Sequence, residues 1–271
     1  MAKKTILVTG ATDGIGRQTA TELARLGHKV LIHGRDKERG VRTMDEINRD
    51  SCNENLTLYL ADFSDFEAVK CMAEEILREQ SDLHVLVNNV GTFSKQRILN
   101  IDGYELTFAV NHLAPFLLTI LLLDLIKSSE PSRIVNVASG AHRSIREIDF
   151  DNLQGQKSFN GYDAYSLSKL ANILFTNELA RRMESSGVTA NSLHPGVIDT
   201  KLLRMSYAMD GANLEEGART SVFLAVSPEV EGVSGTYYST MVEKPTSTLA
   251  QDHDLQKRFW KVSEKLLEKY L

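Results

Sequence analysis

Tyr165 and Lys169 are four positions apart in a stretch that predicts a helix from about residue 161 to 183. Helical residues four apart share a face, so the phenol and the ammonium are expected to project together. A tyrosine with a pKa of about 10 is a poor acid–base group at neutral pH. A nearby ammonium favours the phenolate, so we expect Lys169 to lower the Tyr165 pKa toward the range useful for proton transfer. A solvated surface pair would show the same spacing.

Two further polar residues fall at positions that suggest a site. Ser139 follows a predicted strand at 133–138, at the carboxyl edge where open α/β sheets bind ligands, although a serine there could be a simple turn residue. Asn111 lies within an apolar helix predicted from about residue 104 to 127. A buried amide without partners costs roughly 1–3 kcal/mol, so Asn111 is expected to be hydrogen-bonded.

The elements that would position these groups begin with a strand at 4–9, the glycine spacing G-x-x-x-G-x-G and an amphipathic helix at 17–24. Glycines allow close backbone approach and a helix N-terminus favours an anion, so this unit predicts a dinucleotide-phosphate site. An ordinary glycine-rich turn is the alternative. The residues expected to contact the cofactor here are Gly10, Thr12, Asp13, Gly14, Ile15 and Gly16.

The end of the second predicted strand, at 28–33, bears on the choice of cofactor. Gly34 leaves room there, and Arg35 could hold a 2′-phosphate, with help from Arg17 in the first turn after the glycine loop. These residues favour NADP(H) and make NAD less likely. Against this, Asp36 could take the ribose of NAD, and Arg35 could be a solvated loop charge.

Two more strands end in residues that would reach the same edge. Asp62 and Phe63 follow a strand at 56–61, where Asp62 could lie near adenine or could cap the helix at 66–78. Ser64 or Asp65 could cap that helix equally well. Asn89 and Gly91 follow a strand at 83–87; glycine permits close cofactor approach, although the asparagine could simply stabilise a turn.

Strands and helices alternate along the chain, with further strands at 188–193 and 235–239. This order predicts a single-domain α/β fold over residues 1–271, a Rossmann-like doubly wound parallel sheet of about seven strands with helices on both faces. A helix at about 254–271 carries the only tryptophan, Trp260. The segment at about 200–214 is expected to be a lid over an apolar substrate, or a surface loop with core anchors. Its apolar side chains are Leu202, Leu203, Met205, Tyr207 and Met209.

Composition narrows the possible partners and location. A net charge of −5 and a pI near 5.8 give no reason to expect nucleic acid or an anionic membrane as partner. Cys52 and Cys71 offer neither a disulfide framework nor metal-ligand spacing, which suits the cytoplasm. We expect no signal peptide or membrane anchor, because a strand begins within three residues and the apolar run at 114–126 is too short to span a bilayer.

Together the motifs over about residues 4–240 resemble the short-chain dehydrogenase/reductase family. They are Thr9-Gly10-x-x-x-Gly14-Ile15-Gly16, Asn88-Asn89-x-Gly91, Asn111, Ser139, Tyr165-x-x-x-Lys169 and Pro195-Gly196. Within the family, the retinol-dehydrogenase and WW-domain-oxidoreductase-like branch is most similar. The segments that carry this are 34–36, 111–119, 151–155 and 168–175. Val90 departs from the usual alanine, and neither a membrane anchor nor a WW domain is seen.

The resemblance implies a role for each catalytic residue. Tyr165 would exchange a proton with the substrate oxygen, and Ser139 would hold that oxygen. Lys169 would lower the tyrosine pKa and bind the nicotinamide ribose, while Asn111 would position a water for proton relay. Pro195, Gly196, Val197 and Thr200 would lie along the nicotinamide half of the cofactor.

The expected function is hydride transfer between NADP(H) and an apolar carbonyl or alcohol of retinal-, steroid- or aldehyde-like type. The expected cofactor is NADP, with NADPH as its reduced form. The alternatives are an NAD-linked alcohol dehydrogenase of the same family and a non-enzymatic nucleotide-binding regulatory protein. A homodimer is possible, because family members often pair through the helices that here span about 104–127 and 161–183.

Overall fold

A single eight-stranded sheet forms the centre of the computed structural model, which describes residues 3–200 and 211–271. The strand order is β3-β2-β1-β4-β5-β6-β7-β8, so the order reverses between β1 and β4, and β1 to β7 are parallel. The strands are β1 (Thr5–Val8), β2 (Lys29–Gly34), β3 (Leu56–Leu60), β4 (Val85–Asn88), β5 (Ser132–Val137), β6 (Val188–His194), β7 (Tyr237–Ser239) and β8 (Val242–Glu243). The predicted doubly wound fold is confirmed.

The eighth strand was not predicted. It pairs antiparallel with β7 across a two-residue turn, Thr240 and Met241, whose φ angles are 52° and 61°. Such tight hairpin turns normally use glycine or asparagine at positive φ. Neither threonine nor methionine indicates such a turn, so the sequence did not predict the hairpin.

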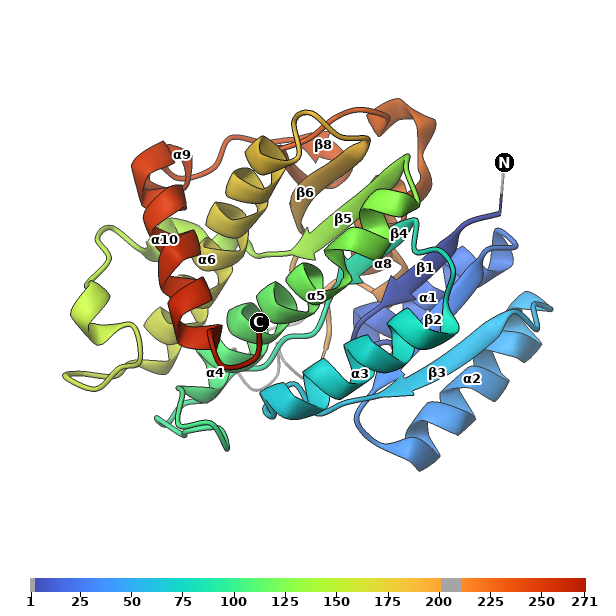
Figure 1. Ribbon diagram of the computed structural model, residues 1–271, viewed down its shortest axis with the longest axis horizontal. Coiled ribbons are helices and arrows are strands. Elements are labelled where there is room, and N and C mark those ends of the chain that lie inside the picture. Colours follow the sequence, from blue (N-terminus) through green and yellow to red (C-terminus); the bar gives the residue numbers. More distant parts are fainter. Residues whose placement is uncertain (1–2, 201–210) are drawn as a thin grey trace.

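Helices cover both faces of the sheet (Figure 1). Residue alternation explains this, because Leu7 packs with the helices of one face while Ile6 and Val8 pack with those of the other. Helices α3, α5 and α6 lie on the first face and α1, α2 and α8 on the second. The helices are α1 (Gly14–Arg25), α2 (Lys37–Ser51), α3 (Phe66–Glu79), α4 (Leu106–Phe108), α5 (Ala114–Ser128), α6 (Gly161–Arg182), α8 (Leu214–Val226), α9 (Thr248–Gln251) and α10 (His253–Leu267).

The apolar helix predicted at 104–127 is interrupted. A π-helical turn at Ala109–Leu113 separates α4 from α5, and the Ala114 N–H bonds back to the Ala109 carbonyl. The combined stretch Leu106–Ser128 is long and apolar enough to cross a bilayer, but 78% of its most apolar window is buried inside the protein. Such burial is typical of a core helix. Asn111 therefore lies in a π-turn, a feature that often occurs at functional sites.

The C-terminal helix α10 lies across α6 and beside α4 and α5 (Figure 1). Its buried residues include Phe259 and Trp260, and the Trp260 ring lies 5.0 Å from that of Phe116 and 5.7 Å from that of Phe175. The side chain of Arg182 stacks on the same indole at 4.1 Å. Helix α10 thus covers part of the helical surface through which pairing was predicted, and the homodimer stays a prediction.

Candidate active site

A cavity of about 950 Å³ opens at the carboxyl ends of the strands, where the order reverses between β1 and β4. The sequence-predicted residues that line it are Gly10, Thr12, Asp13, Gly14, Ile15, Gly16, Arg35, Asp62, Phe63, Asn89, Gly91, Ser139, Tyr165, Lys169, Pro195, Gly196, Val197 and Thr200. Asn111 lies behind the wall, fully buried. One edge of one sheet therefore gathers segments that are up to 190 positions apart (Gly10 to Thr200).

The glycine loop is shaped by contacts that exclude larger side chains. Gly10 and Gly14 have φ angles of +65° and +54°, in the region that favours glycine. A Cβ at Gly16 would lie 2.3 Å from both the Asn89 Nδ2 and the Gly10 carbonyl oxygen. Asp13 caps α1 and accepts the Gly14 N–H at 2.9 Å. Because Asp13 and Gly14 both line the cavity, the N-terminus of α1 opens onto it. This cradle fits the pyrophosphate of a dinucleotide.

His33 is a site residue that the sequence reasoning missed. Its Nδ1 accepts the Gly10 N–H at 3.0 Å, its Nε2 donates to the Ala61 carbonyl at 3.0 Å, and its ring stacks on Phe63 at 4.4 Å. Burial lowers its pKa to about 4, so the imidazole is neutral and bridges the loops after β1 and β3. A histidine ending the apolar run of β2 was the available signal.

The residues predicted to select the cofactor have distinct partners. Arg35 is mostly exposed, with its Nη1 3.8 Å from Asp62 Oδ2. Asp36 caps α2 by accepting the Arg39 N–H at 2.8 Å, so this carboxylate already has a structural role. Arg17, considered as an auxiliary phosphate ligand, pairs with Glu46 at 3.0 Å. The N-cap of α3 is Asp65, whose side chain accepts the N–H groups of Glu67 and Ala68, rather than Asp62 or Ser64.

Tyr165 and Lys169 meet at the base of the cavity. The Lys169 Nζ lies 5.7 Å from the centre of the Tyr165 ring and donates to the Val137 carbonyl at 3.0 Å. Burial raises the pKa of Tyr165 to about 12, opposed by a hydrogen bond with Ser139, and burial lowers the pKa of Lys169 to about 8. The expected lowering of the tyrosine pKa is therefore wrong for the protein alone. Helical spacing gave the proximity, but burial penalises the charged forms of both groups.

Asn111 has a complete set of partners behind this pair. Its Oδ1 accepts the Thr92 N–H at 2.7 Å, and its Nδ2 donates to the Thr92 carbonyl and to Ser168 Oγ, each at 3.0 Å. Ser168 in turn donates to the Tyr165 carbonyl at 2.7 Å. The predicted satisfaction of this buried amide is confirmed, while its water-relay role stays a prediction.

Apolar residues form the wall beside Tyr165. Val90, Leu106 and Val110 line the cavity. The ring of Phe93 stands edge-on to the Tyr165 ring at 6.1 Å. His194, also missed, lines the cavity next to Gly140, and burial is the main cause of its lowered pKa. The predicted lid residues 202, 203, 205, 207 and 209 lie outside the described part of the chain.

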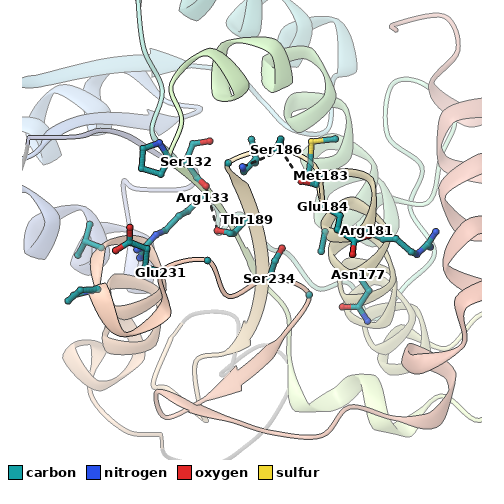
Figure 2. A pocket seen from close by; sticks show the side chains of 18 of the residues that line it. Ser132, Arg133, Asn177, Arg181, Met183, Glu184, Ser186, Thr189, Glu231 and Ser234 are labelled. Carbon is teal, nitrogen blue, oxygen red and sulfur yellow. Dashed lines mark hydrogen bonds between the residues drawn. The ribbon is translucent and has the colours of Figure 1, made fainter.

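A second cavity, of about 960 Å³, lies at the opposite, amino edge of the sheet (Figure 2). Arg133 and Glu231 lie on one side of it, and Asn177 and Glu184 on the other. Arg133 Nη1 donates to the carbonyls of Leu224 and Ser227, at 3.2 and 2.8 Å, and so binds the end of α8. Among the described residues, none of the predicted site residues lines this second cavity.

Comparison with known proteins agrees with this geometry. Residues 4–210 match the short chain dehydrogenase family, and the chain belongs to that family, whose members bind NAD or NADP. It falls in the retinol-dehydrogenase-like branch. Retinol dehydrogenase 14 of Mus musculus is 41% identical over 288 residues, and retinol dehydrogenase 11 of Homo sapiens is 42% identical over 273 residues. Each match covers 97% of this chain and 86% of the relative.

Two solved structures are also similar. An uncharacterised protein from Mycobacterium paratuberculosis has a TM-score of 0.82 at 29% identity, with 98% of this chain and 94% of that chain covered. A protein from Beutenbergia cavernae, described as an NAD(P)-dependent gluconate 5-dehydrogenase with bound NADP, has a TM-score of 0.73 at 27% identity. That match covers 89% of this chain and 96% of the other. The family and fold together define an oxidoreductase.

Proposed function

We propose that this protein is an NADP(H)-dependent oxidoreductase that interconverts an apolar carbonyl compound and its alcohol. The observation that carries the proposal is the convergence of Tyr165, Ser139 and Lys169 beside the glycine cradle in one cavity. The bound cofactor supplies or accepts the hydride. Because its pKa is about 12, the Tyr165 hydroxyl keeps its proton at neutral pH and is suited to donate it to a substrate oxygen in the reducing direction.

The other residues prepare this proton transfer. Ser139, hydrogen-bonded to Tyr165, is placed to hold the substrate oxygen next to the phenol. Protonated Lys169 would favour the phenolate left after transfer. Its own pKa of about 8, lowered by burial, leaves it mostly charged at pH 7 and close enough to neutrality to exchange a proton.

NADP(H) rather than NAD(H) is proposed from the charges at the end of β2. Arg35 extends into the cavity mouth, where a guanidinium can grip a 2′-phosphate, and Asp36 is engaged by the α2 cap. The contact between Arg35 and Asp62 offsets part of the positive charge and keeps the NAD-linked alternative open to test.

The substrate class is proposed from the apolar wall of Val90, Leu106 and Val110, which suits a retinal-, steroid- or aldehyde-like molecule. The names of the retinol dehydrogenase relatives support the same class. We also propose a cytoplasmic location, because the one membrane-length apolar stretch of the described chain is largely buried and both cysteines are free thiols.

The direct test combines a binding titration with a substrate screen. Calorimetry of the purified protein should give tighter binding of NADPH than of NADH. NADPH should then be consumed with at least one member of a panel of aliphatic, aromatic, steroid and retinoid carbonyls. Equal affinities would favour the NAD-linked enzyme. Cofactor binding without turnover of any carbonyl or alcohol would favour the regulatory protein.

A further inference from the structure

His112 is a buried histidine that the proposed chemistry does not use. It follows Asn111 directly in the π-turn and is 1% exposed. Its Nε2 lies 2.8 Å from the Oγ of Ser263, a buried residue of α10. The two residues are 151 positions apart in sequence, so this bond joins the C-terminal helix to the π-turn.

The direction of this bond follows from the hydrogens available. The Ser263 hydroxyl donates its single hydrogen to the Phe259 carbonyl at 3.0 Å. With that hydrogen used, its Oγ accepts the His112 Nε2–H in the tautomer that carries its proton on Nε2. Burial lowers the pKa of His112 to about 3, which keeps the ring neutral. Aromatic rings surround the imidazole at centroid distances of 5.2 to 6.4 Å, and they belong to Phe108, Phe116, Phe175 and Phe259.

On the other side of the π-turn, Asn111 continues the connection to Tyr165. Its Nδ2 donates to Ser168 Oγ at 3.0 Å, and the Ser168 hydroxyl donates to the Tyr165 carbonyl at 2.7 Å. Ser168 is fully buried, as is Asn111. Consecutive residues of one turn thus bond to α10 and to the first part of α6.

We propose that α10 positions the catalytic tyrosine through Ser263, His112, Asn111 and Ser168, an inference that rests on the proposed oxidoreductase function. His112, Ser168 and Ser263 are positioning residues, because none of them lines the cavity. The proposal assigns α10 a part in catalysis in addition to its packing against the core. Small displacements of a catalytic group reduce rates strongly, so loss of the connection should slow turnover more than it weakens binding.

The test compares substitutions on α10. Ser263→Ala removes the acceptor for the His112 N–H, and Ser263→Thr retains a hydroxyl. Leu267→Ala is the matched control, because Leu267 is a buried α10 residue whose loss weakens packing while the hydrogen bond remains. With Ser263→Ala we expect kcat to fall on the order of tenfold, with KM and cofactor Kd changed less than about twofold. Ser263→Thr should recover most of kcat.

Amide hydrogen exchange provides a readout that does not depend on turnover. Exchange at residues 109–113 should accelerate in Ser263→Ala and stay close to wild type in Leu267→Ala. If Ser263→Ala destabilises the fold too far, His112→Phe keeps the aromatic packing and removes the N–H, and it should give the same split between kcat and KM. A wild-type protein without activity would reject the proposed function, whereas the exchange result would still report on the connection.

The positioning role would be overturned if kcat in all these variants simply followed their melting temperatures. It would also be overturned if Ser263→Ala left both kcat and the exchange of residues 109–113 unchanged.

Discussion

The two cavities have nearly the same volume and lie at opposite edges of one sheet, yet their polar groups are arranged differently. At the amino edge, Arg133 and Asn177 bond to backbone carbonyls and so complete the fold. At the carboxyl edge, Tyr165 and Lys169 are buried together with strongly shifted pKa values. Convergent titratable groups beside an anion cradle, rather than volume, mark a functional site.

The largest expected effect is on kcat, and it should follow from a change at the carboxyl-edge cavity but not from one at the amino-edge cavity. Tyr165→Phe removes the proposed proton donor and should lower kcat by about 10²- to 10⁴-fold, with little change in cofactor affinity. Steady-state kinetics at saturating NADPH measures this. Asn177→Ala, which removes a hydrogen bond at the amino-edge cavity, is the matched control and should leave kcat near wild type. A comparable loss in both variants would abolish the distinction.

The next effect concerns the cradle. Gly16→Ala forces a Cβ against Asn89 and the Gly10 carbonyl, an overpacking that costs about 1–3 kcal/mol of stability. The cradle relieves this clash by moving, and restoring its shape around the cofactor costs up to the same free energy, so cofactor binding should weaken by roughly 5- to 150-fold. Gly232→Ala is the control, because this glycine lines the amino-edge cavity with open space around it and φ +73°. It should strain the backbone and reduce stability, while the cofactor Kd by calorimetry stays unchanged.

A smaller and more selective effect is expected at Arg35. A charged hydrogen bond to phosphate contributes about 1.5–3 kcal/mol, so Arg35→Ala should weaken NADPH binding by roughly 10- to 150-fold and leave NADH binding unchanged. Arg17→Ala should change neither, because Arg17 pairs with Glu46. Equal losses of NADPH and NADH affinity would remove the assignment of Arg35 to the 2′-phosphate.

The smallest effect is a pH dependence of stability. Burial lowers the pKa of Lys169 from 10.5 to about 8, so the unfolded chain binds more protons than the native protein between these values. The free energy of unfolding should therefore rise with pH in that window, by on the order of 1–3 kcal/mol from this residue. Above about pH 10 the raised Tyr165 pKa acts in the opposite direction.

Denaturant titrations between about pH 8 and 9.5 would measure this slope, which Lys169→Met should reduce. Burial also lowers the pKa of Lys4 at the amino-edge cavity, but this residue is only partly buried. Lys4→Met should therefore change the slope less. An equal change for Lys4→Met would mean that the two edges bury charge to a similar extent.

The fold was largely predictable because its buried strands are visible in the sequence as apolar runs. Strands such as β1 and β4 are buried on both faces, which requires continuous apolar runs. The hairpin into β8 was not predicted, because Thr240 and Met241 adopt positive φ in a turn that contains no glycine. The π-turn was not predicted from the sequence, because a register shift within a helix needs no particular residue type.

The positions of the site residues were also predictable, since parallel strands bring their carboxyl ends to one edge. The pKa values of the site residues could not be predicted in the same way. Spacing showed that Lys169 lies near Tyr165, but the pKa of the phenol depends on burial by residues distant in sequence. Likewise, the end of the apolar run of β2 marked His33 but not its partners Gly10 and Ala61, and nothing local indicated that His112 would bond to Ser263.

The placement of α10 has a consequence for biosynthesis. The ribosome makes this helix after every other described element, yet its Phe259 and Trp260 complete the core and its Ser263 reaches the π-turn. The glycine cradle can be assembled while the chain is still emerging, but the packing behind Asn111 must wait for the final helix. A nascent chain could therefore acquire its glycine cradle before the packing behind its proposed catalytic residues is complete.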